Sequence, residues 1–470
     1  MRKTVILLHP RVFDHKHSGV PLAPLMLAAT LREAGFKPLI IDQATEENYQ
    51  KTISRNLSDT LYVGVSAMTG SQIQFGLDMC DYIRKRSPDT PIVWGGRHAS
   101  ALPIQTLNDS RADIVVHGEG DFIAVEIAKA IAENSSLENV KGISFKKNDK
   151  IVTTPRTNAI RDLDSLPMIP WGLFDLEKYN AGRKEKTLSI QTGRGCPYSC
   201  TFCSHKIDKT EFFRVFSPTY ILDNIEEAVK KYGINSVNLY EPFFVSKGSR
   251  VDEFCQGLID RKLDISWIAS ARANNFWLLP AFTLKQMKKS GCHYLTFGFE
   301  SGSQRILKRI NKRIRIEDIL KCAQMCHEYD IIPEACFIIG FPFETTADIL
   351  ATLKMVAQVR KLCPTAIFHI QLYTGFPGSI LYNECIKRFG LKQIESLEEW
   401  GNFTKWRNNR AWLKRGEKSL LKLLNGSIYA SSLEYLLSRP DLRLPRTGHF
   451  LISSAYRLYL SLFGQIIKEV

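Results

Sequence analysis

The chain has 470 residues, 44% of them hydrophobic, and a formal net charge of +15. This length predicts two or three domains of about 150 residues each. No stretch reaches the roughly 18 uncharged apolar residues of a spanning helix, which excludes a membrane-spanning protein. The first apolar run, Val5–Leu8, is too short for the core of a signal peptide. The 11 cysteines are an odd number scattered through apolar runs, and this usage predicts a cytoplasmic location.

Residues 1–135 alternate short apolar strands with amphipathic helices. Five strands separated by helices predict a doubly wound parallel sheet, a Rossmann-like α/β domain with helices on both faces. Such a sheet binds its ligand beyond the carboxyl ends of its strands. The strands are predicted at Val5–Leu8, Leu39–Asp42, Tyr62–Ser66, Ile92–Trp94 and Ile114–Val116, and the helices at Pro24–Ala34, Ile73–Arg86 and Phe122–Ile131.

Residues 136–185 are predicted to be a linker that contains a hairpin. The segment Phe145–Asp149 is typical of a turn between two strands, Gly142–Phe145 and Ile151–Thr154. Three prolines follow and interrupt regular structure, so we expect this segment to connect two domains. They are Pro155, Pro167 and Pro170.

A second alternation of strands and helices covers residues 186–388. An eight-unit barrel takes about 250 residues, and only about 200 are available here, so we expect a partial (β/α)6 TIM-type barrel that is open along one side. The strands are predicted at Leu188–Gln191, Val237–Tyr240, Trp267–Ser270, Leu295–Phe299, Ala335–Ile339 and Phe368–Leu372, with helices such as Thr219–Tyr232, Asp318–Tyr329 and Ala347–Leu362.

Residues 389–470 form a basic region that is predicted to be helical. From residue 401 onward, 12 Lys or Arg stand against 4 Asp or Glu. This excess suits nucleic acid, an anionic lipid surface or an acidic substrate, or simply a solvated surface. One predicted helix face would dock on the barrel or, alternatively, lie on a membrane surface. That face carries Tyr456, Leu460, Phe463, Ile467 and Val470. The region also contains Trp400, Trp406 and Trp412, which are explained by ordinary packing or by contact with an amphiphilic or anionic substrate.

Three cysteines, Cys196, Cys200 and Cys203, follow a short apolar strand and a glycine-rich turn. Three thiolates from one loop can hold three irons of a [4Fe-4S] cluster and leave the fourth iron free for a small molecule. Two alternatives stay open. The first is structural zinc, with His205 as fourth ligand, and the second is a redox pair formed by Cys200 and Cys203.

The cysteine triplet, with Phe202 before its last member, resembles the radical S-adenosylmethionine (SAM) superfamily. The resemblance implies that the cluster splits SAM into a radical that abstracts hydrogen from a substrate, with electrons from a donor such as flavodoxin or ferredoxin. Further segments at strand ends match the family in order: Tyr240-Glu241-Pro242, Ser270-Ala-Arg272, Gly298-Phe-Glu300-Ser301-Gly302, Ile339-Gly340-Phe-Pro342 and Tyr373–Gly378. The resemblance implies SAM contacts from Phe202, Glu241, Arg272, Glu300, Ser301 and Gly340.

The first domain resembles the cobalamin-binding domain of one large branch of that superfamily, the class B methyltransferase type. The match lies at three strand ends and implies cobalamin contacts from Ser66, Thr69, Gly95, Gly96 and Gly118. The chain departs from the cobalt-ligating Asp-x-His-x-x-Gly pattern, because Asp14–Gly19 has a different spacing. His15 and His17 are therefore expected to be loop residues that at most line the site, although either could reach the metal.

Together these resemblances imply a cobalamin-dependent radical SAM enzyme that methylates an unactivated carbon of a small or amphiphilic biosynthetic intermediate. A cyclase or rearrangement enzyme of the same architecture is the alternative. An RNA methylthiotransferase is disfavoured because the first domain has only Cys80, too few cysteines for a second cluster. A zinc-stabilised nucleic-acid-binding module is the non-enzymatic alternative, and no nucleic-acid partner is expected.

Overall fold

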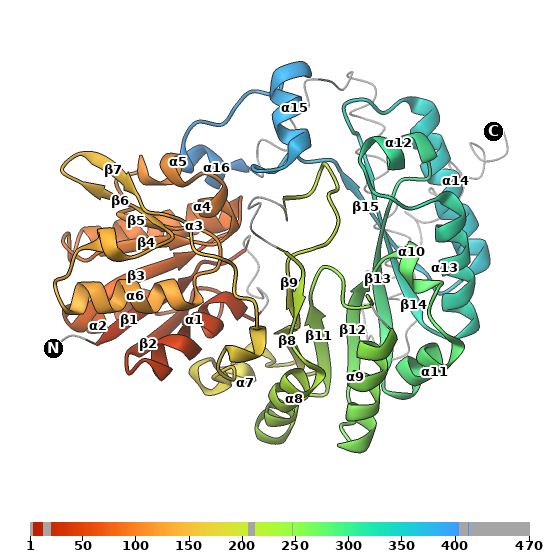
Figure 1. Ribbon diagram of the computed structural model, residues 1–470, viewed down its shortest axis with the longest axis horizontal. Coiled ribbons are helices and arrows are strands. Elements are labelled where there is room, and N and C mark those ends of the chain that lie inside the picture. The colour runs from red at the N-terminus through yellow and green to blue at the C-terminus, as the bar shows by residue number, and fades with distance from the viewer. Residues whose placement is uncertain (1–2, 13–19, 205–211, 247, 404–411, 413–470) are drawn as a thin grey trace, which may run out of the picture.

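The computed structural model describes residues 3–12, 20–204, 212–246, 248–403 and Trp412. Figure 1 shows two lobes side by side, the first built on one sheet and the second on another. In the first lobe the strand order is β2-β1-β3-β4-β5-β6-β7. The five parallel strands are β1 (Thr4–His9), β2 (Lys37–Asp42), β3 (Thr60–Ser66), β4 (Ile92–Gly95) and β5 (Ile114–Val116), which confirms the five predicted strands.

The first sheet is buried on both faces because successive residues of its strands point to opposite sides. Val5 and Leu7 pack in one core, with α1 (Leu22–Glu33) and α6 (Asp121–Ala132). Ile6 and Leu8 pack in the other. There they meet α2 (Tyr49–Asn56) and α3 (Ser71–Arg84), and the short helices α4 (Arg97–Ala101) and α5 (Pro103–Leu107) follow β4. The doubly wound architecture is confirmed.

The predicted hairpin is present, but it extends the first sheet rather than standing between the lobes. Its strands, β6 (Ile143–Lys147) and β7 (Lys150–Thr153), add antiparallel to β5. The segment after it is anchored to the second lobe, where Asn224 accepts a hydrogen bond from the Ile169 amide at 3.0 Å. Trp171 is fully buried and donates to the Asn224 carbonyl. The predicted domain limits themselves stay predictions.

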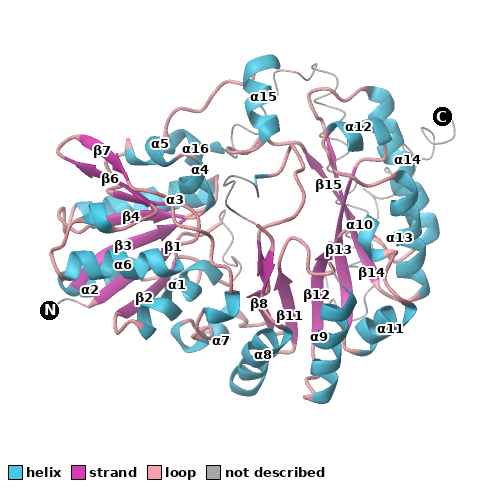
Figure 2. Cartoon of the chain, viewed as in Figure 1, coloured by secondary structure: helices cyan, strands magenta, loops and turns pink. Residues whose placement is uncertain are grey.

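The second lobe is a six-stranded parallel sheet of order β15-β14-β13-β12-β11-β8. Its edge strands do not pair with each other, so the described barrel is incomplete, as expected. The strands are β8 (Thr187–Gln191), β11 (Ser236–Tyr240), β12 (Ser266–Ala271), β13 (Cys292–Glu300), β14 (Ile332–Ile339) and β15 (Ile367–Leu372). Figure 2 shows the helices outside them: α8 (Pro218–Tyr232), α9 (Gly248–Asp260), α10 (Ala273–Phe276), α11 (Ala281–Lys289), α12 (Gln304–Arg309), α13 (Ile316–Glu328) and α14 (Thr346–Leu362).

The chain then returns to the first lobe through α15 (Ile380–Arg388) and α16 (Leu397–Gly401). Trp400 is fully buried, and its indole N–H donates to Gln105 Oε1 at 2.7 Å. Its ring lies 5.4 Å from that of His98, centroid to centroid. The segment 389–403 is therefore a strap that joins the barrel to the first sheet. Trp406 and the predicted helix face at residues 456–470 lie outside the described residues.

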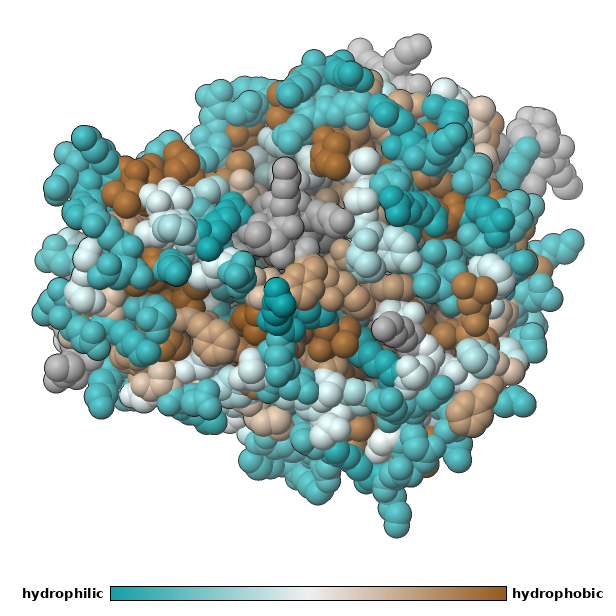
Figure 3. Space-filling model, viewed as in Figure 1, coloured by the Kyte–Doolittle hydropathy of each residue, from teal (hydrophilic) through white to brown (hydrophobic). Residues whose placement is uncertain are grey.

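Most of the face seen in Figure 3 is hydrophilic, as expected for a chain with 24% charged residues. None of the helices in the described part of the chain is long and apolar enough to span a bilayer.

The strap gives a stability prediction. Trp400→Ala should lower the free energy of unfolding by about 3–5 kcal/mol, because it leaves a cavity between the lobes. Urea denaturation monitored by circular dichroism measures the change. Phe282→Ala is the control, since Phe282 is 62% exposed, and should shift stability by less than about 0.5 kcal/mol. Equal effects of the two substitutions would contradict the role of the strap.

Candidate active site

The cysteine loop leaves the barrel through a two-stranded ladder, β9 (Gly193–Arg194) and β10 (Arg214–Val215). Gly195 has a φ of +75°, and a Cβ there would lie 2.3 Å from the Phe212 carbonyl oxygen, so the turn into the loop requires glycine. Cys196, Cys200 and Cys203 follow as partly exposed cysteines. In the described residues no group of three His, Cys, Asp or Glu side chains is arranged to hold a single metal ion, and His205 lies outside them.

Hydrogen bonds from distant segments hold this loop in place. The Thr201 amide donates to the Ile310 carbonyl at 3.0 Å, and the Leu381 amide donates to the Thr201 carbonyl at 2.8 Å. The Asn311 side-chain amide donates to the Ser199 carbonyl at 2.9 Å. Three thiols on one loop, held from two sides, are a donor set that fits a cluster with one cysteine per iron.

Two of the predicted SAM contacts are Phe202, which belongs to this loop, and Arg272, which lies beside it. Nη1 of Arg272 is 3.9 Å from Cys200 Sγ, and its guanidinium stacks on the Tyr198 ring at 3.6 Å. The Phe202 ring is edge-on to Phe341, at 6.2 Å between centroids. Phe341 follows Gly340 at the end of β14, so the loop and that strand end are neighbours.

Glu300 ends β13 in a strained conformation. Its φ is +64°, in the left-handed region that residues other than glycine rarely adopt, and the strand bulges between Gly298 and Glu300. Lys312 Nζ donates to Glu300 Oε1 at 2.7 Å, and both side chains are 8% exposed. A Cβ at Gly298 would lie 2.3 Å from the same oxygen, so the glycine makes room for the carboxylate.

Glu241, by contrast, is bound within the protein. Arg250 donates to both of its carboxylate oxygens, at 3.2 and 3.0 Å, and Thr192 donates to Oε2 at 3.0 Å. The Glu241 side chain is 0% exposed. Ser301 is also fully buried and shares a 3.1 Å hydrogen bond with Thr352. In the described structure these two side chains fix the strand ends, and their SAM contacts stay predictions.

Gly340 forms a tight turn at the end of β14 with a φ of +82°. Glu344 Oε2 accepts hydrogen bonds from the amides of Gly340 and Phe341. Burial raises the pKa of the Glu344 carboxyl to about 7, although those two amides act to lower it. Trp412 donates its indole N–H to the Gly340 carbonyl at 3.0 Å. A residue of the C-terminal region therefore covers this turn.

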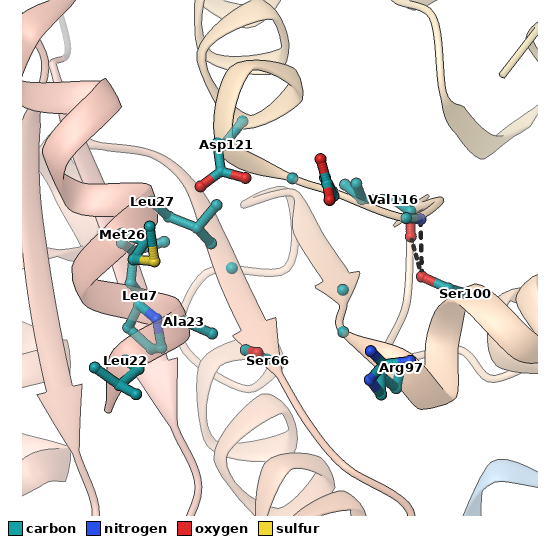
Figure 4. Close-up of a pocket in the computed structure, with 18 of the residues that line it drawn as sticks. Leu7, Leu22, Ala23, Met26, Leu27, Ser66, Arg97, Ser100, Val116 and Asp121 are labelled. Atoms are coloured by element: carbon teal, nitrogen blue, oxygen red, sulfur yellow. Dashed lines mark hydrogen bonds between the residues drawn. The ribbon is translucent and has the colours of Figure 1, made fainter. Parts of the chain in front are cut away.

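A cavity of about 320 Å³ lies between the carboxyl ends of the first sheet and the start of the cysteine loop. Ser66, Gly95, Gly96 and Gly118, four of the predicted cobalamin contacts, line it. Figure 4 shows Ser66 at its centre, with Met26 and Leu27 of α1 on one side and Arg97 and Ser100 on the other. Leu7, Leu22, Ala23, Val116 and Asp121 also line it, together with Gln191, Gly193, Arg194, Gly195, Tyr240 and Pro242 of the second lobe.

Thr69, the fifth predicted cobalamin contact, does not line this cavity. Its hydroxyl lies 3.0 Å from His98 Nδ1, next to Trp400 of the strap. Gly96 has a φ of +92°, and a Cβ there would lie only 3.0 Å from the Ala67 carbonyl oxygen, so this part of the cavity wall requires glycine. Its apolar α1 side and glycine-lined strand ends fit a large planar group with a nucleotide tail. His15 and His17 lie outside the described residues.

Two ion pairs join the lobes beside the cavity, and the sequence analysis missed them. Arg194 of β9 donates to Asp121 at 2.6 and 2.9 Å, and Arg214 of β10 donates to Glu119 at 2.7 and 3.1 Å. Burial acts to lower the pKa of Arg194, but the carboxylates of Asp121 and Glu119 raise it overall. The only signal in the sequence was the place of Arg194 between two glycines just before Cys196.

Comparisons with known proteins give two family-model matches, the radical SAM superfamily over residues 190–356 and a B12 binding domain over residues 11–128. An uncharacterized methyltransferase of Pyrococcus horikoshii is 28% identical over 372 residues, which cover 78% of this chain and 79% of the relative. The anaerobic magnesium-protoporphyrin IX monomethyl ester cyclase of Rubrivivax gelatinosus is 28% identical over 401 residues, 81% of this chain and 69% of the relative.

A solved structure of TsrM, a radical SAM methyltransferase from Kitasatospora setae with cobalamin and a [4Fe-4S] cluster bound, has the same fold. Its TM-score is 0.71 at 16% identity, over 86% of this chain and 85% of that one.

The cavity wall gives a binding prediction. A Cβ at Gly95 would meet only the Val116 Cβ, at 4.0 Å, so a larger side chain fits there without backbone strain and fills the cavity. Gly95→Leu should weaken cobalamin binding by about tenfold or more, a loss of about 1.4 kcal/mol, measured by equilibrium dialysis. Gly172→Leu, at an exposed glycine of the connecting segment, should bind as the wild type does. Unchanged binding in Gly95→Leu would place the cofactor elsewhere.

The cysteine loop gives a second prediction. In protein reconstituted anaerobically without cobalamin, Cys200→Ala should abolish the visible absorbance and remove most of the iron, since one of three cluster thiolates is gone. Iron and sulfide analysis measures the loss. The control is Cys363→Ala, at a fully buried cysteine after α14, which should keep its iron. An iron content as high in Cys200→Ala as in the control would refute the cluster site.

The two matched models fall on the two lobes that carry the cysteine loop and the cavity. A radical SAM domain uses a [4Fe-4S] cluster and SAM, and a B12-binding domain uses cobalamin, so the three expected cofactors are confirmed. The thiol donor set and the glycine-lined cavity described above fit these groups. The chain therefore belongs to the cobalamin-binding radical SAM enzymes.

Proposed function

We propose that this enzyme transfers a methyl group to an unactivated carbon of a small or amphiphilic biosynthetic intermediate. One observation carries the proposal: the cavity that would hold cobalamin is lined by both lobes and opens at the base of the cysteine loop. When bound, the cluster with SAM supplies hydrogen abstraction and cobalamin supplies the methyl group. A substrate between them would meet both, which methyl transfer to carbon requires.

The chain's own residues hold these two centres together. Arg97 lines the cavity, and its Nη1 donates to the Ser204 carbonyl, next to Cys203, at 3.4 Å. The ion pairs of Arg194 and Arg214 fix the opposite side of the same loop. This arrangement orients the two cofactor sites relative to each other.

The relative named as a methyltransferase, which aligns over most of its own length, supports methyl transfer. The relative named as a cyclase has the same 28% identity to this chain, and it supports the second candidate, a radical cyclase of the same architecture. The methylthiotransferase alternative stays disfavoured: Cys80 is fully buried, and burial raises the pKa of its thiol well above the usual range, which suits a core residue. An electron donor such as flavodoxin or ferredoxin and a cytoplasmic location complete the proposal.

The test is isotope transfer. The reconstituted enzyme, with cobalamin, a low-potential reductant and SAM deuterated in its methyl group, is incubated with a metabolite extract of its source cells. A product that carries the intact labelled methyl group on carbon is expected, measured by mass spectrometry. The Cys200→Ala protein is the control and should give no such product.

Two other outcomes separate the alternatives. Formation of 5′-deoxyadenosine with a new unlabelled product would favour the cyclase. A wild-type protein that holds its cluster but forms no 5′-deoxyadenosine with any extract would contradict radical chemistry altogether.

A further inference from the structure

Arg272 directly follows β12 and is 6% exposed. Its guanidinium contacts two neutral oxygens, one aromatic ring and one cysteine sulfur. Nη2 donates to the Lys312 carbonyl, and Nε donates to Asn274 Oδ1 at 3.4 Å. One face stacks on the Tyr198 ring at 3.6 Å, and Nη1 lies 3.9 Å from Cys200 Sγ.

This guanidinium has no carboxylate partner, unlike the other buried arginines of the described chain. Arg214 pairs with Glu119, and Arg250 pairs with Glu241. For Arg272, no Asp or Glu among the described residues lies within ion-pair distance, and the neighbouring Lys312 is already compensated by Glu300. A buried charge without a counter-charge is strongly unfavourable, so a negative group is expected at its open side.

The side chain itself indicates where that negative group is. Arg272 is fixed from three directions, and its remaining contact is the Cys200 sulfur, which becomes anionic when it ligates iron. A cysteine that ligates iron is a thiolate, and hydrogen bonds and charges around cluster sulfurs set the reduction potential.

We propose that Arg272 is a positioning residue that compensates the Cys200 thiolate and raises the reduction potential of the cluster. Reduction adds one electron, taken from dithionite or a low-potential carrier protein, and moves no proton or bond. The site then carries one more negative charge, which a guanidinium in hydrogen-bond contact stabilises more than it stabilises the oxidised state. The inference depends on the cluster of the proposed function but not on methyl transfer.

The test is a redox titration of the reconstituted protein without SAM, followed by electron paramagnetic resonance. Arg272→Gln removes the charge, and Arg272→Lys keeps it but loses the planar fork. At a fixed potential the reduced-to-oxidised ratio should fall about tenfold or more in Arg272→Gln, equivalent to a shift of about 59 mV for one electron. Arg272→Lys should lie between Arg272→Gln and the wild type.

A matched control removes the same charge elsewhere. Arg261 follows α9 at the opposite end of the barrel and pairs with Asp223 and Glu226. Arg261→Gln should leave the potential at the wild-type value. The SAM dissociation constant, measured on the same proteins, should change less than about twofold in Arg272→Gln.

A competing role is contact with the SAM carboxylate, and the two measurements distinguish it. Weaker SAM binding at an unchanged potential would overturn the proposal. If Arg272→Gln does not retain iron, the Arg272→Lys protein decides, and a potential equal to that of the wild type would also overturn it. Because neither measurement involves turnover, a lowered potential in an enzyme that transfers no methyl group would reject only the proposed function.

Discussion

The candidate active site depends on the ladder that closes the cysteine loop onto the first lobe. Arg194 and Arg214 are direct cross-strand partners on β9 and β10, an arrangement of like charges that is unfavourable by itself. Asp121, the first residue of α6, and Glu119, two residues before it, compensate both charges across the interface. Buried ion pairs add little net stability but discriminate against wrong arrangements, because a displaced arginine would leave a buried carboxylate unpaired. This contact therefore sets how the cysteine loop and the cavity face each other.

Two strand ends near the cysteine loop have backbone conformations in the left-handed region, and the one at Glu300 is strained. Glu300 and Gly340 both have positive φ values at the ends of β13 and β14. Each is held by a neighbour, Glu300 by Lys312 and the Gly340 turn by Glu344. Such conformations persist only where the surroundings enforce them, and they gather at functional sites. The parallel sheet brings them to one edge, near the loop of thiols.

The strap completes the assembly from the other side. A Cβ at Gly401 would lie 2.9 Å from the Gln74 amide nitrogen, so α16 approaches α3 backbone to backbone. Trp400 fills the space that this approach leaves between Tyr382 and His98. Trp412 then reaches the Gly340 turn. The C-terminal region thus contacts both the first lobe, through Trp400, and the barrel, through Trp412 at the Gly340 turn.

The sequence alone determined the two sheets, the cysteine loop and the glycines of the cavity. Hydrophobic periodicity and strand-end glycines are local, so they could be located without a structure. The tertiary structure decided the partners: Arg194 meets Asp121 from 73 residues away, and Trp400 meets Gln105 from 295. It also placed the hairpin in the first sheet, bound Glu241 to Arg250 and set Arg272 beside Cys200. These outcomes depend on which distant charges and surfaces share a buried space, and residue spacing carries no record of that.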